Sequence, residues 1–344
     1  MKGFLQCACL LLLVAVAQAQ DPQFSQYYQA PLYLNPGFTG ITPQQRLVAN
    51  HRLQWPNLPQ AFATYSISYD LFVDELRSGF GLMAMTDKMG SAGWRTTTVG
   101  LLYSYKVKLS DKIVFSPGLY FGYGTNGIDR TKISLGDGLE YDGISLDPEV
   151  AKLGRQSYFD FGSGFLVYSR TFWIGASFLH MNKPNISVLN EVSRLPMKTS
   201  IHAGARVPLS GNFRARANPR ASYLTPSIIY RMQGKNFSQM DIGVNYHIDP
   251  VSVGLWYRGK PFEKTVINTA SQDALVLTLG LYFKSLSIGY SYDFTISELQ
   301  TSSGGAHEIS IVYEFVTKSR SKSDRRKYKL IPCPTFNSKE GFWN

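Results

Sequence analysis

The sequence predicts an all-β protein: a transmembrane antiparallel up-and-down β-barrel of about fourteen strands. Three observations predict this fold. Many stretches alternate between large apolar and small or polar residues, an export signal precedes them, and the connections between them differ systematically in length. Aromatic residues make up 14% of the chain and 30 residues are glycine, as expected for interfacial aromatic girdles and crowded inward positions.

Residues 1–19 are predicted to be a cleaved export signal. Lys2 precedes an apolar run from Phe4 to Ala17, and Ala17-Gln18-Ala19 forms an A-x-A exit. We therefore expect the mature chain to start near Gln20, outside the cytoplasm. No later apolar run approaches the roughly 18 residues that a membrane-spanning helix needs.

Residues 20–43 form a predicted leader on the periplasmic side. Its prolines and glycines exclude a long helix or a central strand. Its aromatic side chains are nevertheless too apolar to remain in water. Two interpretations stay open: the leader packs on the base of the fold, or it docks to a partner.

The stretch Ser285–Ser297 shows the strand pattern most clearly. Every even position from Leu286 to Ile296 is large and apolar, and every odd position is small or polar. A period of two places these two sets on opposite faces of an extended strand. One face therefore needs an apolar solvent, which another sheet or a lipid bilayer could supply.

The same reading along residues 44–317 gives fourteen predicted strands. Inward positions carry Ser, Gly, Thr, Asn and charges such as Asp241, Asp293, Glu308 and Arg206, which favours a hydrated lumen. Whether the lumen is open or filled stays undecided at this point. The predicted strands are 44–54, 61–72, 78–87, 93–109, 112–125, 156–169, 171–181, 198–209, 220–233, 238–249, 251–259, 273–284, 285–297 and 306–317.

The connections favour lipid as the apolar solvent. Odd-numbered connections are mostly long, and even-numbered ones are mostly tight. Outer-membrane barrels combine short periplasmic turns with long outer loops, so we expect an outer-membrane protein with both termini in the periplasm. The long connections are 126–155, 182–197, 260–272 and 298–305; the exceptions are a short one near 234–237 and longer even ones near 73–77 and 210–219.

Residues 318–344 form a predicted basic tail on the periplasmic side. Seven of the residues behind the formal charge of +11 fall within Lys318–Lys329. Nucleic acid is an improbable partner for an exported protein. The tail is either a solubilising arm or, as the apolar residues after it favour, a docking segment. Cys333 is either a buried apolar residue or a modification site.

The sequence contains no catalytic or cofactor motif. The five histidines are scattered, without metal-ligand spacing, and G-x-S-x-G is absent. His307 lies on the apolar face of its strand and is the one candidate for a lipase, although an interfacial ring is the favoured interpretation. Loop 136–149 is rich in acidic residues and glycine, but its spacing is not that of a recognised calcium loop.

Motifs along the mature chain resemble those of the PorP/SprF family of outer-membrane barrels, which is associated with type IX secretion and gliding in Bacteroidetes. One departure is the extension Asn337–Asn344 beyond the closing Cys-Pro motif. The motifs are Asp21–Tyr28, Pro31–Gly40, Arg52 with Gln54-Trp55-Pro56, Ser68-Tyr69-Asp70, Tyr292-Asp293-Phe294, His307-Glu308-Ile309-Ser310 and Pro332–Phe336.

The resemblance implies a non-enzymatic role in secretion. The barrel would help to export a cargo protein or to anchor a surface adhesin, with outer loops meeting cargo and periplasmic ends meeting ring and motor components. A simple diffusion porin is the alternative. The residues expected to bind partners are Phe24, Tyr27, Tyr28, Tyr33, Asn35, Pro36, Trp55, Arg325, Arg326, Lys327, Cys333 and Phe336.

Overall fold

The computed structural model describes most of the chain between residues 21 and 315. The predicted export signal, the acidic loop 136–149 and the basic tail 318–344 lie outside the described residues. In the described part, no helix is long and apolar enough to cross a membrane. The described ranges are 21–42, 44–58, 61–90, 93–129, 154–188, 192–209, 222–234, 237–264, 270–283, 285–296 and 303–315.

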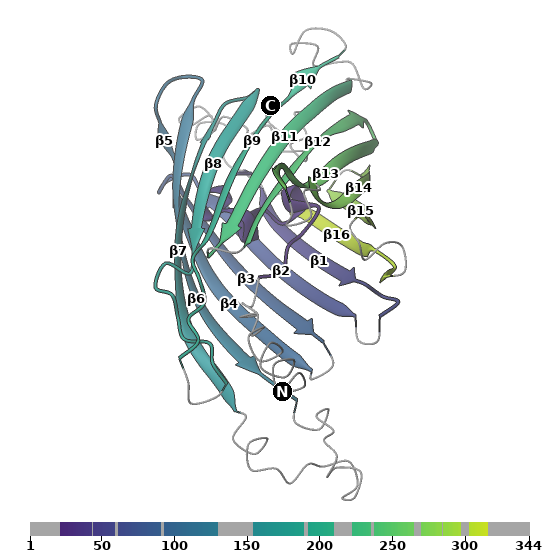
Figure 1. The fold of residues 1–344 in the computed structure, drawn as a ribbon. Coiled ribbons are helices and arrows are strands. Elements are labelled where there is room, and N and C mark those ends of the chain that lie inside the picture. The colour runs from purple at the N-terminus through teal and green to yellow at the C-terminus, as the bar shows by residue number, and fades with distance from the viewer. Residues whose placement is uncertain are drawn as a thin grey trace, which may run out of the picture.

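The strands form a closed antiparallel barrel (Figure 1), which confirms the predicted fold. Two of the wall strands are each interrupted by a single residue, Lys106 between β4 and β5 and Arg206 between β9 and β10. Counting each of these pairs as one strand, because both members pair with the same neighbour, gives a barrel of fourteen strands. The strands are β1 (Gln45–Gln54), β2 (Phe62–Val73), β3 (Ser78–Met89), β4 (Trp94–Tyr105), β5 (Val107–Lys108), β6 (Val114–Gly127), β7 (Arg155–Tyr168), β8 (Phe172–Leu179), β9 (Lys198–Ala205), β10 (Val207–Pro208), β11 (Ser222–Gln233), β12 (Phe237–Ile248), β13 (Val251–Lys264), β14 (Ala270–Tyr282), β15 (Leu286–Thr295) and β16 (Ala306–Phe315).

The barrel closes where the last strand meets the first. The β1–β16 pairing runs from Gln45 opposite Phe315 to Gln54 opposite Ala306. We call the end of the barrel where β1 begins and β16 ends the turn end. The opposite end, where β1 passes into β2, is the loop end.

The largest error in a predicted boundary is at the end of β13. The strand expected at 251–259 continues to Lys264 and the next strand begins at Ala270, so most of the connection predicted at 260–272 is strand, and residues 265–269 lie outside the described residues. Pro261 lies in the added part of the strand, although proline cannot donate to a strand ladder. The structure accommodates the longer strand with register shifts between Arg258 and Gly259 and between Lys260 and Lys264.

Side chains alternate between the two faces of the wall as predicted. In β15, Ile288, Tyr290 and Phe294 point outward and are exposed, whereas Ser291 and Asp293 point into the barrel and are buried. The outward band continues around the barrel, where Leu101 is 61% and Phe159 75% exposed. An apolar outer face of this extent is typical of a wall that contacts lipid.

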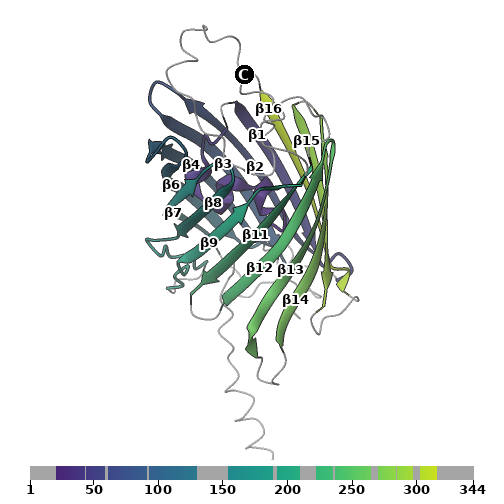
Figure 2. The same cartoon turned by 90° about the horizontal axis from the view of Figure 1, so that it is seen from above.

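Residues 21–42, which we call the plug, lie inside the barrel (Figure 1, Figure 2). The plug contains the short helices η1 (Tyr27–Gln29), α2 (Pro31–Leu34) and η2 (Pro36–Phe38). Asp21 contacts residues at the loop end, whereas Gly40 contacts Asp70 near the turn end, where β1 starts. The leader therefore crosses the lumen instead of lying on the base of the barrel.

The plug also changes the interpretation of the inward charges. Asp241, Asp293 and Glu308 were expected to line a hydrated lumen, but they are 3% or less exposed. The physical reason is that hydrogen-bond donors surround these carboxylates. Some donors belong to the plug, and others belong to wall arginines that the plug covers. The lumen is filled at this level. The sides of the membrane that the two ends of the barrel face stay a prediction.

Candidate functional site

Glu308 of β16 holds the first turn of the plug. Its two carboxylate oxygens accept the backbone N–H groups of Ser25 at 2.7 Å and Gln26 at 2.9 Å. The Gln26 side chain, which is fully buried, donates to the Glu308 carbonyl oxygen and accepts from the hydroxyl of Ser310. Glu308 thus satisfies backbone groups that would otherwise be buried without partners.

The Ser25 hydroxyl joins a buried ion-pair network in the wall. It donates to Asp293 at 2.7 Å and accepts from Arg52 at 2.8 Å and Arg258 at 2.9 Å. Three arginines face three carboxylates there, so the formal charges cancel. The pairs are Arg52–Asp293 at 2.8 Å, Arg52–Glu308 at 3.3 Å, Arg231–Asp241 at 2.6 Å, Arg258–Asp241 at 3.1 Å and Arg258–Asp293 at 2.8 Å.

Asn35 holds the middle of the plug against the opposite wall. Its side-chain oxygen accepts the Gly37 N–H at 2.8 Å, which caps η2. Its nitrogen donates to the carbonyl oxygens of Phe165 in β7 at 2.9 Å and Ala176 in β8 at 3.0 Å. One amide therefore fixes both the turn and its position in the lumen.

Lys106 closes the network near the turn end. Its ammonium group donates to the carbonyl oxygens of Thr39 at 2.8 Å and Gly37 at 3.3 Å, and to the hydroxyl of Ser116 at 2.7 Å. Gly40 donates its N–H to Asp70 at 2.8 Å, and Asp70 pairs with Arg46 through two hydrogen bonds. Gly40 has a φ of +59°, which favours glycine at this position.

Aromatic contacts complete the packing. Phe24 and Tyr33 of the plug meet edge to face at 5.5 Å between ring centroids. Tyr27 meets Trp256 of β13 in the same way at 5.3 Å, and Phe38 stacks on His202 of β9 at 5.2 Å. These rings bury apolar area that the polar inward faces of the strands could not provide alone.

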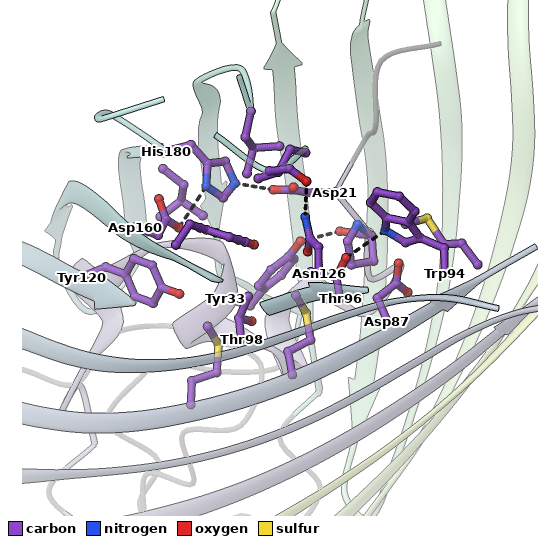
Figure 3. Close-up of a pocket in the computed structure, with 18 of the residues that line it drawn as sticks. Asp21, Tyr33, Asp87, Trp94, Thr96, Thr98, Tyr120, Asn126, Asp160 and His180 are labelled. Carbon is purple, nitrogen blue, oxygen red and sulfur yellow. Dashed lines mark hydrogen bonds and ion pairs between the residues drawn. The ribbon is translucent and has the colours of Figure 1, made fainter. Parts of the chain in front are cut away.

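A charged clasp holds the start of the plug (Figure 3). His180, just after β8, contacts Asp21 through Nε2 at 2.8 Å and Asp160 through Nδ1 at 2.9 Å. Lys198 lies 3.3 Å from the same Asp21 carboxylate. Burial disfavours the charged imidazole, but Asp21 first and then Asp160 outweigh it and raise the pKa of His180 to about 9.

Two cavities adjoin the clasp. The larger, which we call the vestibule, has a volume of about 630 Å³, and Asp21, Pro22 and Gln23 of the plug line it together with loop-end residues such as Trp55 and Gly305. A side pocket of about 60 Å³ lies between the plug and the wall, beside the Met83 and Tyr120 side chains (Figure 3). Asp21, Pro22, Asp87 and Met89 line both cavities.

The predicted partner-binding residues divide into three groups. Those between Phe24 and Pro36 lie in the plug and make their contacts within the chain, so binding elsewhere would require the plug to leave the lumen. Trp55 lines the vestibule and packs on Phe62. Arg325, Arg326, Lys327, Cys333 and Phe336 lie outside the described residues, and the role of the whole set stays a prediction.

Sequence reasoning missed the residues that hold the plug. Ser25, Arg52, Asp293 and Glu308 all belong to the motifs that carry the family resemblance, but nothing local indicates that they meet. The available signal was charge at inward strand positions, which needs a buried counter-charge or donor. Lys106 carried the same signal, since it falls inside the predicted strand 93–109, two positions after the inward Ser104, although the structure has a one-residue break between β4 and β5 there.

His307 does not meet a serine in the described part of the chain. It lies on the outer face of β16 and its Nδ1 is 2.8 Å from the hydroxyl of Tyr290. Its ring also packs against Tyr292 at 4.9 Å. This environment agrees with an aromatic ring at the membrane interface. Among the described residues, no group of three or more His, Cys, Asp or Glu side chains could hold a metal ion.

Comparison with protein families decides the relationship. The model for the type IX secretion system membrane protein PorP/SprF matches residues 16–313. The chain belongs to the PorP/SprF family. The motifs that resemble this family between residues 21 and 310 are the ones that form the plug and much of its contact with the wall. The chain is therefore an outer-membrane β-barrel of the type IX secretion family.

Solved structures of other outer-membrane proteins are similar to this chain at low identity. The toluene transporter TodX of P. putida is 10% identical, with a TM-score of 0.48, over 83% of this chain and 94% of that chain. The outer membrane protein Omp33 of Acinetobacter baumannii is 7% identical, with a TM-score of 0.40, over 80% of this chain and 100% of that chain. No curated protein sequence matches this PorP/SprF member.

Proposed function

We propose that this PorP/SprF protein is a non-enzymatic scaffold of type IX secretion that assists export or surface anchoring of a cargo protein. Family membership supports the secretion role. The filled lumen supports the proposal that the barrel acts as a scaffold, because a plug that is hydrogen-bonded to both sides of the wall would obstruct the passage of solutes through a simple diffusion porin. Binding surfaces at the two ends, rather than passage of solutes, are then what the barrel offers.

The two ends receive different partners in this proposal. The loop end faces the outside and meets cargo or an adhesin, and the turn end faces the periplasm. Phe315, the last described residue, lies at the turn end. The basic segment 318–344, which follows it in the sequence, is the part that we assign to ring and motor components. The plug makes its contacts inside the lumen, which leaves this tail as the segment available for periplasmic docking.

The test compares three chains in the native host: the full-length protein, a variant with Arg325→Gln, Arg326→Gln and Lys327→Gln, and a control that lacks only 337–344. We expect the triple variant to lose most co-purifying type IX components and most cargo at the cell surface, because its tail loses three positive charges. The control should keep both.

Two results would contradict the proposal. The first is an unchanged partner set and unchanged cargo secretion in the triple variant and in a chain lacking 318–344. The second is steady ion conductance by the full-length protein in a planar bilayer, together with normal secretion after deletion of the whole barrel. The second result would favour the diffusion porin.

A further inference from the structure

The side pocket between the plug and the wall collects oxygen atoms that lack donors. The Oδ1 atoms of Asn126 in β6 and Asp160 in β7 are buried, and no residue in the described ranges donates a hydrogen bond to either. Both side chains line the pocket (Figure 3). A buried acceptor without a donor is costly, so these atoms indicate a ligand that donates hydrogen bonds.

Asp87 of β3 contributes a carboxylate that has no cation beside it. It is 3% exposed and lines the pocket, and one of its oxygens accepts the Thr64 hydroxyl at 2.6 Å. No Lys, Arg or His of the described part of the chain forms an ion pair with it. A buried carboxylate with a single neutral donor is costly unless a positive charge joins it.

The charged groups around the pocket leave one negative charge without compensation. His180 pairs with both Asp21 and Asp160, and Lys198 pairs with Asp21. Asp87 raises the number of carboxylates to three, against these two cations. Water could donate to the oxygen atoms but could not supply the missing charge, so the excess favours a cationic ligand.

The walls of the pocket favour an organic cation over a metal ion. Tyr33, Trp94 and Tyr120 line it (Figure 3), together with the apolar side chains of Met83 and Leu179. Aromatic rings attract ammonium groups, whereas a hard metal ion would need oxygen ligands in place of these side chains. The pocket volume is about 60 Å³, and one water needs about 10–15 Å³ of such space, so roughly four non-hydrogen atoms can enter.

We propose that the side pocket binds a small aliphatic primary amine in its ammonium form. The three N–H groups of such a ligand equal in number the acceptors that the pocket offers, which are the Asp87 carboxylate and the Oδ1 atoms of Asn126 and Asp160. Leu32 and Tyr33 of the plug line the same pocket as these wall residues, so the ligand joins the plug to the wall. This inference does not rest on the proposed role in secretion.

The first test titrates ethylammonium chloride into the purified full-length protein and measures the heat of binding. Sodium chloride controls for ionic strength, and ethanol controls for the alkyl chain. We expect saturable binding of ethylammonium and none of ethanol. Asp87→Asn should weaken the binding about tenfold or more, as expected when one charge-assisted hydrogen bond is lost. Asp273→Asn is the matched control, because Asp273 is exposed in the vestibule, bonds to Gln239 and does not line the side pocket.

The second test blocks the pocket without changing its charge. Thr98→Phe places a ring among the lining residues and should abolish the binding. Thr97→Phe in the same strand is the control, because Thr97 lies on the outer face and meets the Thr86 hydroxyl. Where Thr98→Phe does not form a heat-modifiable barrel, Asn126→Leu replaces it, since leucine has a similar size but no acceptor, and it should weaken the binding.

The contact of the ligand with the plug has its own measurement. In the wild type, saturating ethylammonium should slow hydrogen exchange in peptides from 21–42, because a ligand that binds only the assembled pocket stabilises it. Four results would overturn the proposal: no saturable binding by the wild type, equal binding of ethanol, equal weakening by Asp273→Asn and Asp87→Asn, or undiminished binding by an assembled Thr98→Phe barrel.

Discussion

At the scale of single residues, the plug is held by groups that each serve several partners. The Ser25 hydroxyl takes part in three hydrogen bonds, to Asp293, Arg52 and Arg258. Removing one member of a buried charged network leaves the others unsatisfied, which typically costs about 3–5 kcal/mol for a charge. The network therefore couples the position of the plug to the stability of the wall.

His180 makes the clasp sensitive to pH. Its pKa in the folded protein is about 9, above the ordinary value of 6.5, so folding favours the protonated ring. The stabilisation that it contributes is complete below about pH 6.5, declines as the pH rises, and is lost above about pH 9.

The measurement is the thermal unfolding midpoint of the wild type and of His180→Gln across this range. At pH 6, we expect the unfolding midpoint of the variant to be lower than that of the wild type, by about 2–4 °C for each kcal/mol that the protonated His180 contributes to stability. The difference should shrink to nothing near pH 9.5. A difference that stays constant with pH would mean that His180 contributes only as a neutral hydrogen-bonding group.

At the scale of elements, β6 shows how closely the plug approaches the wall. A Cβ atom added to Gly118 would overlap the carbonyl carbon of Pro36 and would lie 2.5 Å from the Gly37 nitrogen, both backbone atoms of η2. Backbone atoms cannot move aside as the end of a side chain does. Gly118 is therefore required by the plug rather than by the strand itself.

We expect Gly118→Ala to lower the midpoint of unfolding and to speed hydrogen exchange in the peptides around η2. Overpacking of this kind typically costs about 1–3 kcal/mol. Gly127→Ala in the same strand is the control, because its nearest contact would be the Arg155 side chain at 3.8 Å. Equal effects at both positions would show that loss of strand glycine, and not contact with the plug, is responsible.

The strands could be predicted from the sequence because their pattern is local. In each strand, apolar and polar residues alternate with a period of two, and turn residues mark most ends. All fourteen strands of the barrel were therefore predicted. The end of β13 was wrong because register shifts are set by the partner strand. The plug site could not be predicted, since Ser25 and Glu308 are 283 positions apart and both look like ordinary polar residues in sequence.

At the scale of the whole molecule, the barrel and its plug depend on different interactions. The strand ladder closes through the β1–β16 pairing without any contribution from residues 21–42. The plug then fills a lumen whose side chains are polar or charged, and water could solvate them if the plug were absent. The wall should therefore assemble without the plug, and the plug should decide whether the barrel conducts.

We accordingly expect a chain lacking 21–42 to form a heat-modifiable barrel that passes ions steadily in a planar bilayer, while the full-length protein stays closed. Where deletion prevents assembly, Asn35→Ala with Lys106→Ala loosens the plug in a full-length chain and should give intermittent opening. Equal steady conductance of the wild type and the double variant at all voltages would mean that ions pass around the plug.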